Sequence, residues 1–141
     1  MALVTAIAQA VAATLNAAPR ALPFTAELRY RPVFELRELA TLKVSVVPRS
    51  TGRKRGSRAG DVRRVQVDVG VQRKVANDDE VTALLGLVEE LADCFRVGQR
   101  LASYPDAVCT ELVNEPVYAP EHLEQYRQFT SVLTLTFEVG P

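Results

Sequence analysis

Four valines spaced two residues apart, in the segment VQVDVGV (65–71), constrain the fold more than any other feature. Successive side chains of a β-strand point to opposite faces of the sheet, so a period of two predicts a strand with one buried face. The same period recurs in residues 24–30, 42–47 and 129–139, and a further strand is predicted near residues 107–113. These segments predict a sheet of about five strands.

Two other segments follow the period of a helix. In residues 2–17, apolar side chains recur three or four positions apart until Pro19 ends the pattern. A second helix is predicted from Asn77, whose spacing to Glu80 matches a capping box, with Gly98 as its C-terminal stop. Residues 34–42 are predicted to form a turn or a short helix. The order of elements predicts an α+β fold in one domain over residues 1–141, with a mostly antiparallel sheet and two helices packed on one face.

Positive charge is concentrated between the second and third predicted strands. We expect Pro48 to end the strand at residues 42–47, so that the two strands pair as an antiparallel hairpin around a long basic loop at residues 49–64. The whole chain balances 17 Lys and Arg against 17 Asp and Glu. The loop holds one acid, Asp61, and seven basic residues: Arg49, Arg53, Lys54, Arg55, Arg58, Arg63 and Arg64. This local excess indicates a contact site and not a generally basic protein.

Three roles are open for this basic loop. It could bind the phosphates of nucleic acid, although no recognition helix carries these residues and no aromatic residue lies among them. It could be a mobile, solvated hairpin tip. It could also become ordered only on meeting an acidic protein partner or a neighbouring subunit.

Signatures of catalysis and of cofactor binding are nearly absent from the sequence. The single histidine, His122, has no recognisable nucleophile or orienting partner, and we interpret it as a surface residue of a connecting turn. Glu89 and Glu90 are adjacent on a predicted helix and point in different directions. No phosphate-binding glycine motif and no metal-ligating cluster occur in the sequence. We therefore predict a protein that is not an enzyme and holds no cofactor and no metal.

The cysteines and the N-terminus bear on the compartment. Cys94 and Cys109 lack CxxC spacing, and we interpret them as buried, reduced thiols in a reducing compartment. Residues 1–21 lack a positively charged start, which favours a cytosolic amphipathic helix over a signal peptide. No segment is apolar over the length that a membrane span needs, so no membrane partner is predicted.

Three stretches of the chain carry a resemblance to a known family. The segments are NEPVYAPEHLEQYRQFTSVLTLTFEV (114–139), FELRELATLKVSVVPR (34–49) followed by VQVDVGVQRK (65–74), and NDDEVTALLGLVEELADCF (77–95). They resemble the closing run, the central hairpin and the second helix of tail terminator and tail completion proteins (minor tail proteins) of long-tailed bacteriophages and prophages. The resemblance spans most of the chain, and residues 1–20 are its least distinctive part.

The resemblance implies a non-enzymatic structural protein of the virion tail, assembled in the host cytoplasm. It implies a small α+β domain that forms a homo-oligomer, a hexameric ring around the DNA path. Such a ring caps the tail tube protein, ends its polymerisation and offers a surface to the head connector protein. It maps the seven basic residues as a candidate contact with tube, neighbouring subunit or, non-specifically, DNA in the pore, and residues 115–129 as a candidate subunit contact. The alternative is a nucleic-acid-binding module that uses the basic loop.

Overall fold

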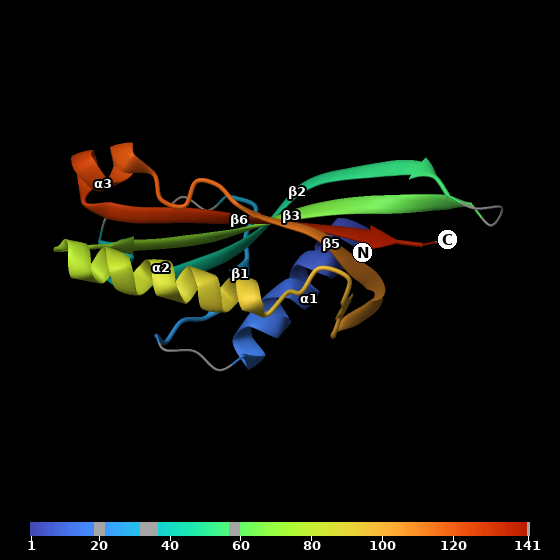
Figure 1. Ribbon diagram of the computed structural model, residues 1–141, viewed down its shortest axis with the longest axis horizontal. Helices are drawn as coiled ribbons and strands as arrows, with labels where there is room; N and C mark the ends of the chain where they lie inside the picture. Colours follow the sequence, from blue (N-terminus) through green and yellow to red (C-terminus); the bar gives the residue numbers. More distant parts are fainter. Residues whose placement is uncertain (19–21, 32–36, 57–59, 141) are drawn as a thin grey trace.

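A computed structural model describes residues 1–18, 22–31, 37–56 and 60–140 (Figure 1). The α+β class is confirmed, and the order of the described elements is α1 (Leu3–Ala17), β1 (Ala26–Leu28), the 3-10 helix η1 (Glu38–Ala40), β2 (Lys43–Arg55), β3 (Asp61–Lys74), α2 (Asp78–Asp93), β4 (Arg100–Leu101), β5 (Tyr104–Asn114), α3 (Pro120–Tyr126) and β6 (Gln128–Val139). The prediction of a turn or short helix at residues 34–42 is confirmed by η1. The predicted helix end at Pro19 and residues 34–36 of the predicted turn lie outside the described residues.

The strands form one sheet in the order β1-β2-β3-β6-β5-β4. All the recorded pairs are antiparallel except β1 with β2, which is parallel. The sheet is therefore mostly antiparallel, as predicted, but it has six strands in the described part of the chain and is mixed. The strand that sequence analysis missed, β4, has two residues, and a segment that short cannot show a period of two.

Two helices, α1 and α2, lie on the same face of the sheet, as predicted (Figure 1). Both contribute to one apolar core with the valines of β3 and the alternate residues of β6. The register places core side chains opposite one another, with Val65 beside Phe137 and Val69 beside Leu133. Burying side chains of this size stabilises the fold by roughly 1.5–3 kcal/mol each. This core positions the two strands that carry the basic residues.

The N-terminus of α2 is capped as its sequence predicts. The Asn77 side chain accepts a hydrogen bond from the Glu80 N–H at 3.0 Å, and the Glu80 carboxylate accepts one from the Ala76 N–H at 2.8 Å. The predicted stop at Gly98 is wrong, because α2 ends at Asp93 with Cys94 as its C-cap. Gly98 adopts a φ of 91° in the following turn, where its N–H donates to the Cys109 carbonyl at 2.7 Å.

A third helix, α3, stands where a connection was predicted. Pro120 occupies its first turn, where the missing N–H of proline costs no hydrogen bond. Arg127 ends the helix in the left-handed conformation, with a φ of 49°. His122 therefore lies in a short helix and not in a connecting turn.

The prediction of a long loop at residues 49–64 is wrong for the described part of that segment. β2 runs on to Arg55 and β3 begins at Asp61, and the two pair from Ser50 opposite Gln66 to Arg55 opposite Asp61. Pro48 does not end β2; the register shifts between Pro48 and Ser50, which marks a bulge. A proline is tolerated there because β2 pairs with β1 only through Val46 and is an edge strand beyond it.

We call residues 49–55 of β2 and 61–64 of β3 the basic ribbon. Gly56 and Gly60 close it with a hydrogen bond of 3.2 Å from the Gly56 N–H to the Gly60 carbonyl. The ribbon projects beyond the helices at one end of the molecule, whereas α3 and the start of α2 lie at the other end (Figure 1). The ribbon is thus a rigidly rooted projection and not a loop.

Candidate functional site

Six of the seven predicted contact residues lie on the basic ribbon and are exposed: Arg49, Arg53, Lys54, Arg55, Arg63 and Arg64. Arg58 lies outside the described residues. Sequence analysis therefore places most of these residues together correctly, but it treats them as one cluster. The structure divides them between the two faces of the ribbon.

On the face turned away from the helices, each basic side chain meets an acid from elsewhere in the sheet. The Arg49 guanidinium lies 3.3 Å from Asp68, the Lys54 ammonium 2.7 Å from Glu138, and the Arg64 guanidinium 3.7 Å from Glu111. Exposed pairs of this kind contribute at most about 1 kcal/mol each to stability. Their main effect here is to neutralise the charge of this face.

Hydrogen bonds between strands continue the same polar face. The Asp68 carboxylate accepts from the Thr134 hydroxyl at 2.7 Å, and the Gln66 side chain accepts from Ser50 at 2.7 Å and donates to Thr136 at 3.2 Å. A groove of about 460 Å³ runs over it, lined by Arg49, Gln66, Glu111, Val113, Glu115, Thr134 and Thr136. Because its charges are paired within the chain, this face offers little net charge to a partner.

On the helix side of the ribbon, Arg53, Arg55 and Arg63 form no ion pair with any residue that the structure describes. The strand register nevertheless sets Arg55 opposite Asp61. Arg53 lies directly opposite Arg63 in the strand register. Like charges opposite one another on neighbouring strands destabilise a ribbon. Beside Arg63, a groove of about 690 Å³ is lined partly by Arg100, Tyr104 and Asp106. We call Arg53, Arg55 and Arg63 the free basic face.

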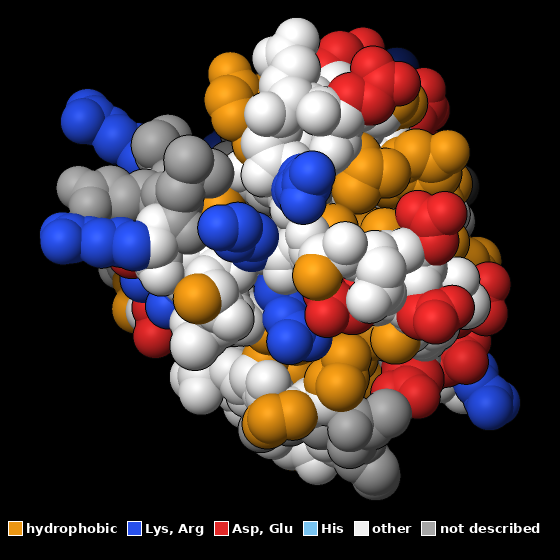
Figure 2. Space-filling view, turned by 90° about the vertical axis from the view of Figure 1, so that its left-hand side faces the viewer, with side chains coloured by type: hydrophobic (Ala, Val, Ile, Leu, Met, Phe, Trp, Pro, Cys, Tyr) orange, Lys and Arg blue, Asp and Glu red, His pale blue; other side chains and the backbone are white. Residues whose placement is uncertain are grey.

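An acidic surface lies on α2, towards the other end of the molecule. α2 contains six acids and neither lysine nor arginine in the sequence DDEVTALLGLVEELAD. Its exposed positions are five of these acids together with three small residues: Asp78, Asp79, Thr82, Ala83, Gly86, Glu89, Glu90 and Asp93. In the view of the end away from the ribbon, acidic side chains gather mostly on the right-hand side and basic ones mostly on the left (Figure 2). The fold thus separates the charges of a neutral chain.

Residues 115–129, the second candidate contact, form an exposed corner of the structure. Three apolar side chains, Val117, Tyr118 and Tyr126, are between 41% and 50% exposed. His122 is half-buried; its Nδ1 lies 2.9 Å from the Thr130 hydroxyl, and its ring packs edge-on against Tyr126 at 6.3 Å between ring centres. The contact with Thr130 joins α3 to β6, and the three apolar side chains face solvent.

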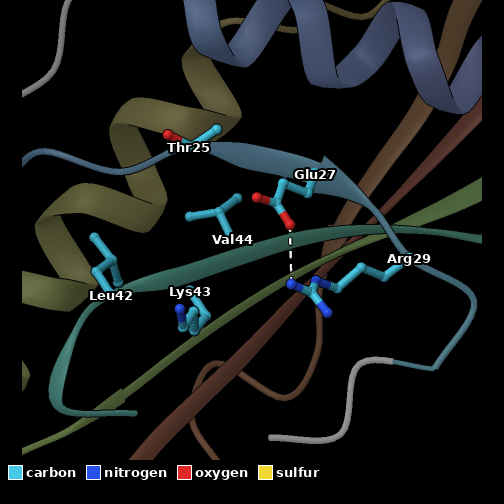
Figure 3. A pocket seen from close by; sticks show the side chains of 6 residues that line it. All are labelled: Thr25, Glu27, Arg29, Leu42, Lys43 and Val44. Atoms are coloured by element: carbon cyan, nitrogen blue, oxygen red, sulfur yellow. Dashed lines mark hydrogen bonds and ion pairs between the residues drawn. The ribbon is translucent and has the colours of Figure 1, made fainter. Parts of the chain in front are cut away.

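A small groove of about 220 Å³ lies where β1 pairs with β2 (Figure 3). Its lining includes Glu27, Arg29 and Lys43, and the Arg29 guanidinium lies 2.9 Å from the Glu27 carboxylate. Glu27 is the one carboxylate among the described lining residues, and it is already paired. The groove therefore presents no free carboxylate for acid–base chemistry.

The two cysteines differ in their surroundings. Cys109 is buried, which confirms the prediction for this residue, whereas Cys94 is only half-buried. Burial raises the pKa of Cys109 above the ordinary value of 9.0, offset in part by a backbone hydrogen bond with Glu111. Burial also raises the pKa of Cys94, and the charges of Asp93 and Glu90 add to that rise. Both thiols are therefore poor nucleophiles at neutral pH.

The described residues bring together no group of three or more histidine, cysteine, aspartate or glutamate side chains that could hold a metal ion. Within the same residues, the helices are too short or too polar to cross a membrane.

Comparison of the chain with protein-family models gives no match, and no curated protein matches it. Among solved structures, one similar chain is the sheath/tube terminator, in the extended state, of PVC, an extracellular contractile injection system. The likeness covers 100% of this chain and 58% of that chain, at 14% sequence identity and a TM-score of 0.43. The chain thus spans less than two thirds of the length of that structure. A likeness at this level carries no argument about partners or activity.

Sequence analysis missed the acids that neutralise half of the basic ribbon. Asp68 and Glu138 occupy the polar positions of two alternating segments, so their face could be read from the pattern. The basic residues that pair with these acids could not be read from the pattern. Lys54 and Glu138 are 84 residues apart and meet only through the register of β2, β3 and β6.

Proposed function

We propose that this chain is a structural protein of a phage-type tail, a tail terminator that assembles into a ring. In this proposal the ring caps the tail tube, ends its polymerisation and presents a surface to the head connector. The observation that carries the proposal is the projection of the basic ribbon beyond the core, at the opposite end from the start of the acidic α2. A single domain with unlike charges at separate places is suited to self-assembly.

The sequence resemblance supports the same proposal. The resembling segments correspond to the β2–β3 hairpin, to α2, and to the run from the end of β5 through α3 and β6. They therefore include the exposed corner at residues 115–129 and the strand segments from which the ribbon projects, whereas the ribbon itself, apart from Arg49, lies between the resembling segments. The proposal assigns the ribbon and this corner to contacts with tube or neighbouring subunit.

The charge layout supports closed, head-to-tail assembly. In a heterologous interface, one surface of a subunit meets a different surface of the next identical subunit, and a suitable rotation closes the chain of contacts into a ring. Complementary charge gives such contacts their specificity. The proposed partners are further copies of this chain, six in the ring, together with tube protein and head connector. The proposed location is the virion tail, after assembly in the host cytoplasm.

Electron microscopy of the purified protein, with and without tail tubes, tests the proposal. We expect rings on the ends of tubes and an end to tube growth. A variant in which residues 53–63 are replaced by Asn-Gly should keep its fold and lose the cap, because Gly52 and Arg64 already face each other across the ladder. Globular monomers that never cap a tube would overturn the proposal.

The free basic face favours a second candidate, a nucleic-acid-binding module. That function requires duplex binding that weakens steeply with salt. It also requires loss of binding when Arg53, Lys54, Arg55 and Arg58 are changed to serine. A gel shift that is the same for this variant and the native protein would exclude it.

A further inference from the structure

We infer that the free basic face of one copy docks on the exposed acidic face of α2 in a second copy of this chain. The inference rests on the self-assembly that the proposed function requires, but not on the capping of a tail tube. It names the two surfaces that meet. On the ribbon these are Arg53, Arg55 and Arg63, and on α2 they centre on Glu89 and Asp93.

The ribbon half of this contact is unfavourable in an isolated chain. Arg53 and Arg63 face each other across β2 and β3 without an acid between them among the described residues. Beyond Val139 of β6, the ribbon is also only two strands wide, and two-stranded ribbons are marginal in water. An acidic partner would remove the repulsion and cover the ribbon.

The α2 surface of this contact also carries repulsion between like charges in an isolated chain. Glu89 and Asp93 are four residues apart, so two like charges are neighbours on the helix surface. They also stand in the last two turns, where the helix dipole is negative, and α2 has no basic residue in its last turn. Neither acid forms an ion pair with a described residue. Each surface therefore carries a repulsion that the other would relieve.

The shape of each surface suits the other. The exposed middle of α2 is formed by the small residues Thr82, Ala83 and Gly86, which let a strand approach the helix axis closely. The ribbon runs away from α2 of its own chain (Figure 1), so the contact requires a second molecule. The charges are also opposite in sign, because the free basic face carries three arginines without an ion pair to a described residue and α2 contains no lysine or arginine.

Nucleic acid fits the free basic face less well than a second copy does. Only three of the described ribbon cations are unpaired, since Arg49, Lys54 and Arg64 are already neutralised. Three cations, one of them opposite Asp61 in the strand register, would neutralise few phosphates, so counterion release would contribute little to binding.

Sedimentation equilibrium of the full chain tests the inference through paired charge reversals. The first variant is Arg53→Glu with Arg63→Glu, and the second is Glu89→Lys with Asp93→Lys. Alone, each variant should self-associate at least about 100-fold more weakly than the native protein, since like charges brought together across an interface cost several kcal/mol. An equal mixture should regain nearly native association, because each reversed surface then meets its complement.

The control variant carries Arg31→Glu with Lys74→Glu, two exposed positions outside the basic ribbon. It loses the same net charge as the first variant and should associate like the native protein. Circular dichroism and urea unfolding check that every variant folds. If the double reversal on the ribbon fails to fold, Arg53→Gln with Arg63→Gln serves instead, with an expected loss of about 10-fold. Native association should weaken with salt, because the Debye length falls from about 30 Å at 0.01 M to about 3 Å at 1 M.

Three results would overturn the inference. They are a native protein that stays monomeric at low salt, variants that associate like the native protein, and a mixture that regains no association. A monomer that binds duplex DNA through Arg53 and Arg63 would assign the free basic face to nucleic acid instead. Rings that cap tubes and persist in both variants would refute this contact but keep the proposed function. Association through this contact without tube capping would refute the function but keep the contact.

Discussion

In the inner half of the β2–β3 hairpin, Val44, Val46, Val69 and Val71 are buried under the helices, whereas every side chain from Ser50 to Arg55 in the outer half is exposed. One antiparallel ladder runs through both halves, interrupted by a single register shift after Pro48. The backbone is therefore nearly the same in the two regions, and only the surroundings differ.

The inner and outer halves of the hairpin are stabilised in different ways. The inner half gains free energy by removing apolar surface from water. In the outer half only β3 gains in that way, through Val65 opposite Thr51, whereas β2 gains none and ordering its residues costs conformational entropy. Its structure is stabilised by the ladder and by ion pairs on one face, while its other face carries unpaired charge. A projection of this kind is expected to meet a partner.

The largest difference in unfolding free energy between the two halves should appear when one carboxylate is introduced into each half in turn. Val69→Asp buries an unpaired charge among core side chains and should cost more than about 4 kcal/mol of unfolding free energy, enough to unfold the chain. Thr51→Asp in the exposed half should change it by less than about 0.5 kcal/mol. Urea unfolding followed by circular dichroism measures both. Similar losses in the two variants would show that the outer half is packed like the core.

A smaller difference in unfolding free energy should distinguish two ion pairs on the polar face. Asp68→Ala removes the acceptor of the Thr134 hydroxyl and of Arg49, and should cost about 1–2 kcal/mol because Asp68 is partly buried between strands. Lys54→Ala breaks a more exposed pair and should cost no more than about 1 kcal/mol. Urea unfolding at 0.1 M salt gives both values. A larger loss at Lys54 would mean that the outer ribbon depends on its ion pairs for structure.

The smallest effect on stability should come from introducing a thiol. The rate at which each thiol reacts then reports how accessible its region is to solvent. At pH 8 a cysteine introduced by Thr51→Cys should react with a disulfide reagent at once, whereas native Cys109 should react only as the protein unfolds. Cys94, half-buried and with a raised pKa, should react at an intermediate rate.

The sign of the pH dependence follows from the raised pKa values of both native thiols. The folded state disfavours their thiolates, so the cysteines leave stability unchanged at neutral pH. The free energy of unfolding falls only as the pH rises through the ordinary value of 9.0 towards the raised folded values. In the experiment with the disulfide reagent, rapid reaction of Cys109 in the folded protein would show that the sheet opens beside β5.

Much of the fold follows from local patterns. The period of two places the core face of β3 and β6 correctly, and Asn77 with Glu80 marks the start of α2. Two predictions failed where a local rule met a tertiary exception. Pro48 reads as a strand end, but β2 has no neighbour on its outer side there and tolerates the proline at a bulge. Gly98 reads as a helix stop, but α2 ends earlier, at Asp93.

The sequence by itself determined which residues are basic, which strand faces are apolar and where α2 begins, because charge, periodicity and capping act over a few neighbouring residues. Only the tertiary structure decided which of the basic residues have partners. Lys54 and Arg64 are neutralised because strand register brings Glu138 and Glu111 beside them. Arg53 and Arg63 stay unpaired because the same register sets them against each other. Pairing across a sheet depends on contacts between distant parts of the chain, and no local pattern encodes those contacts.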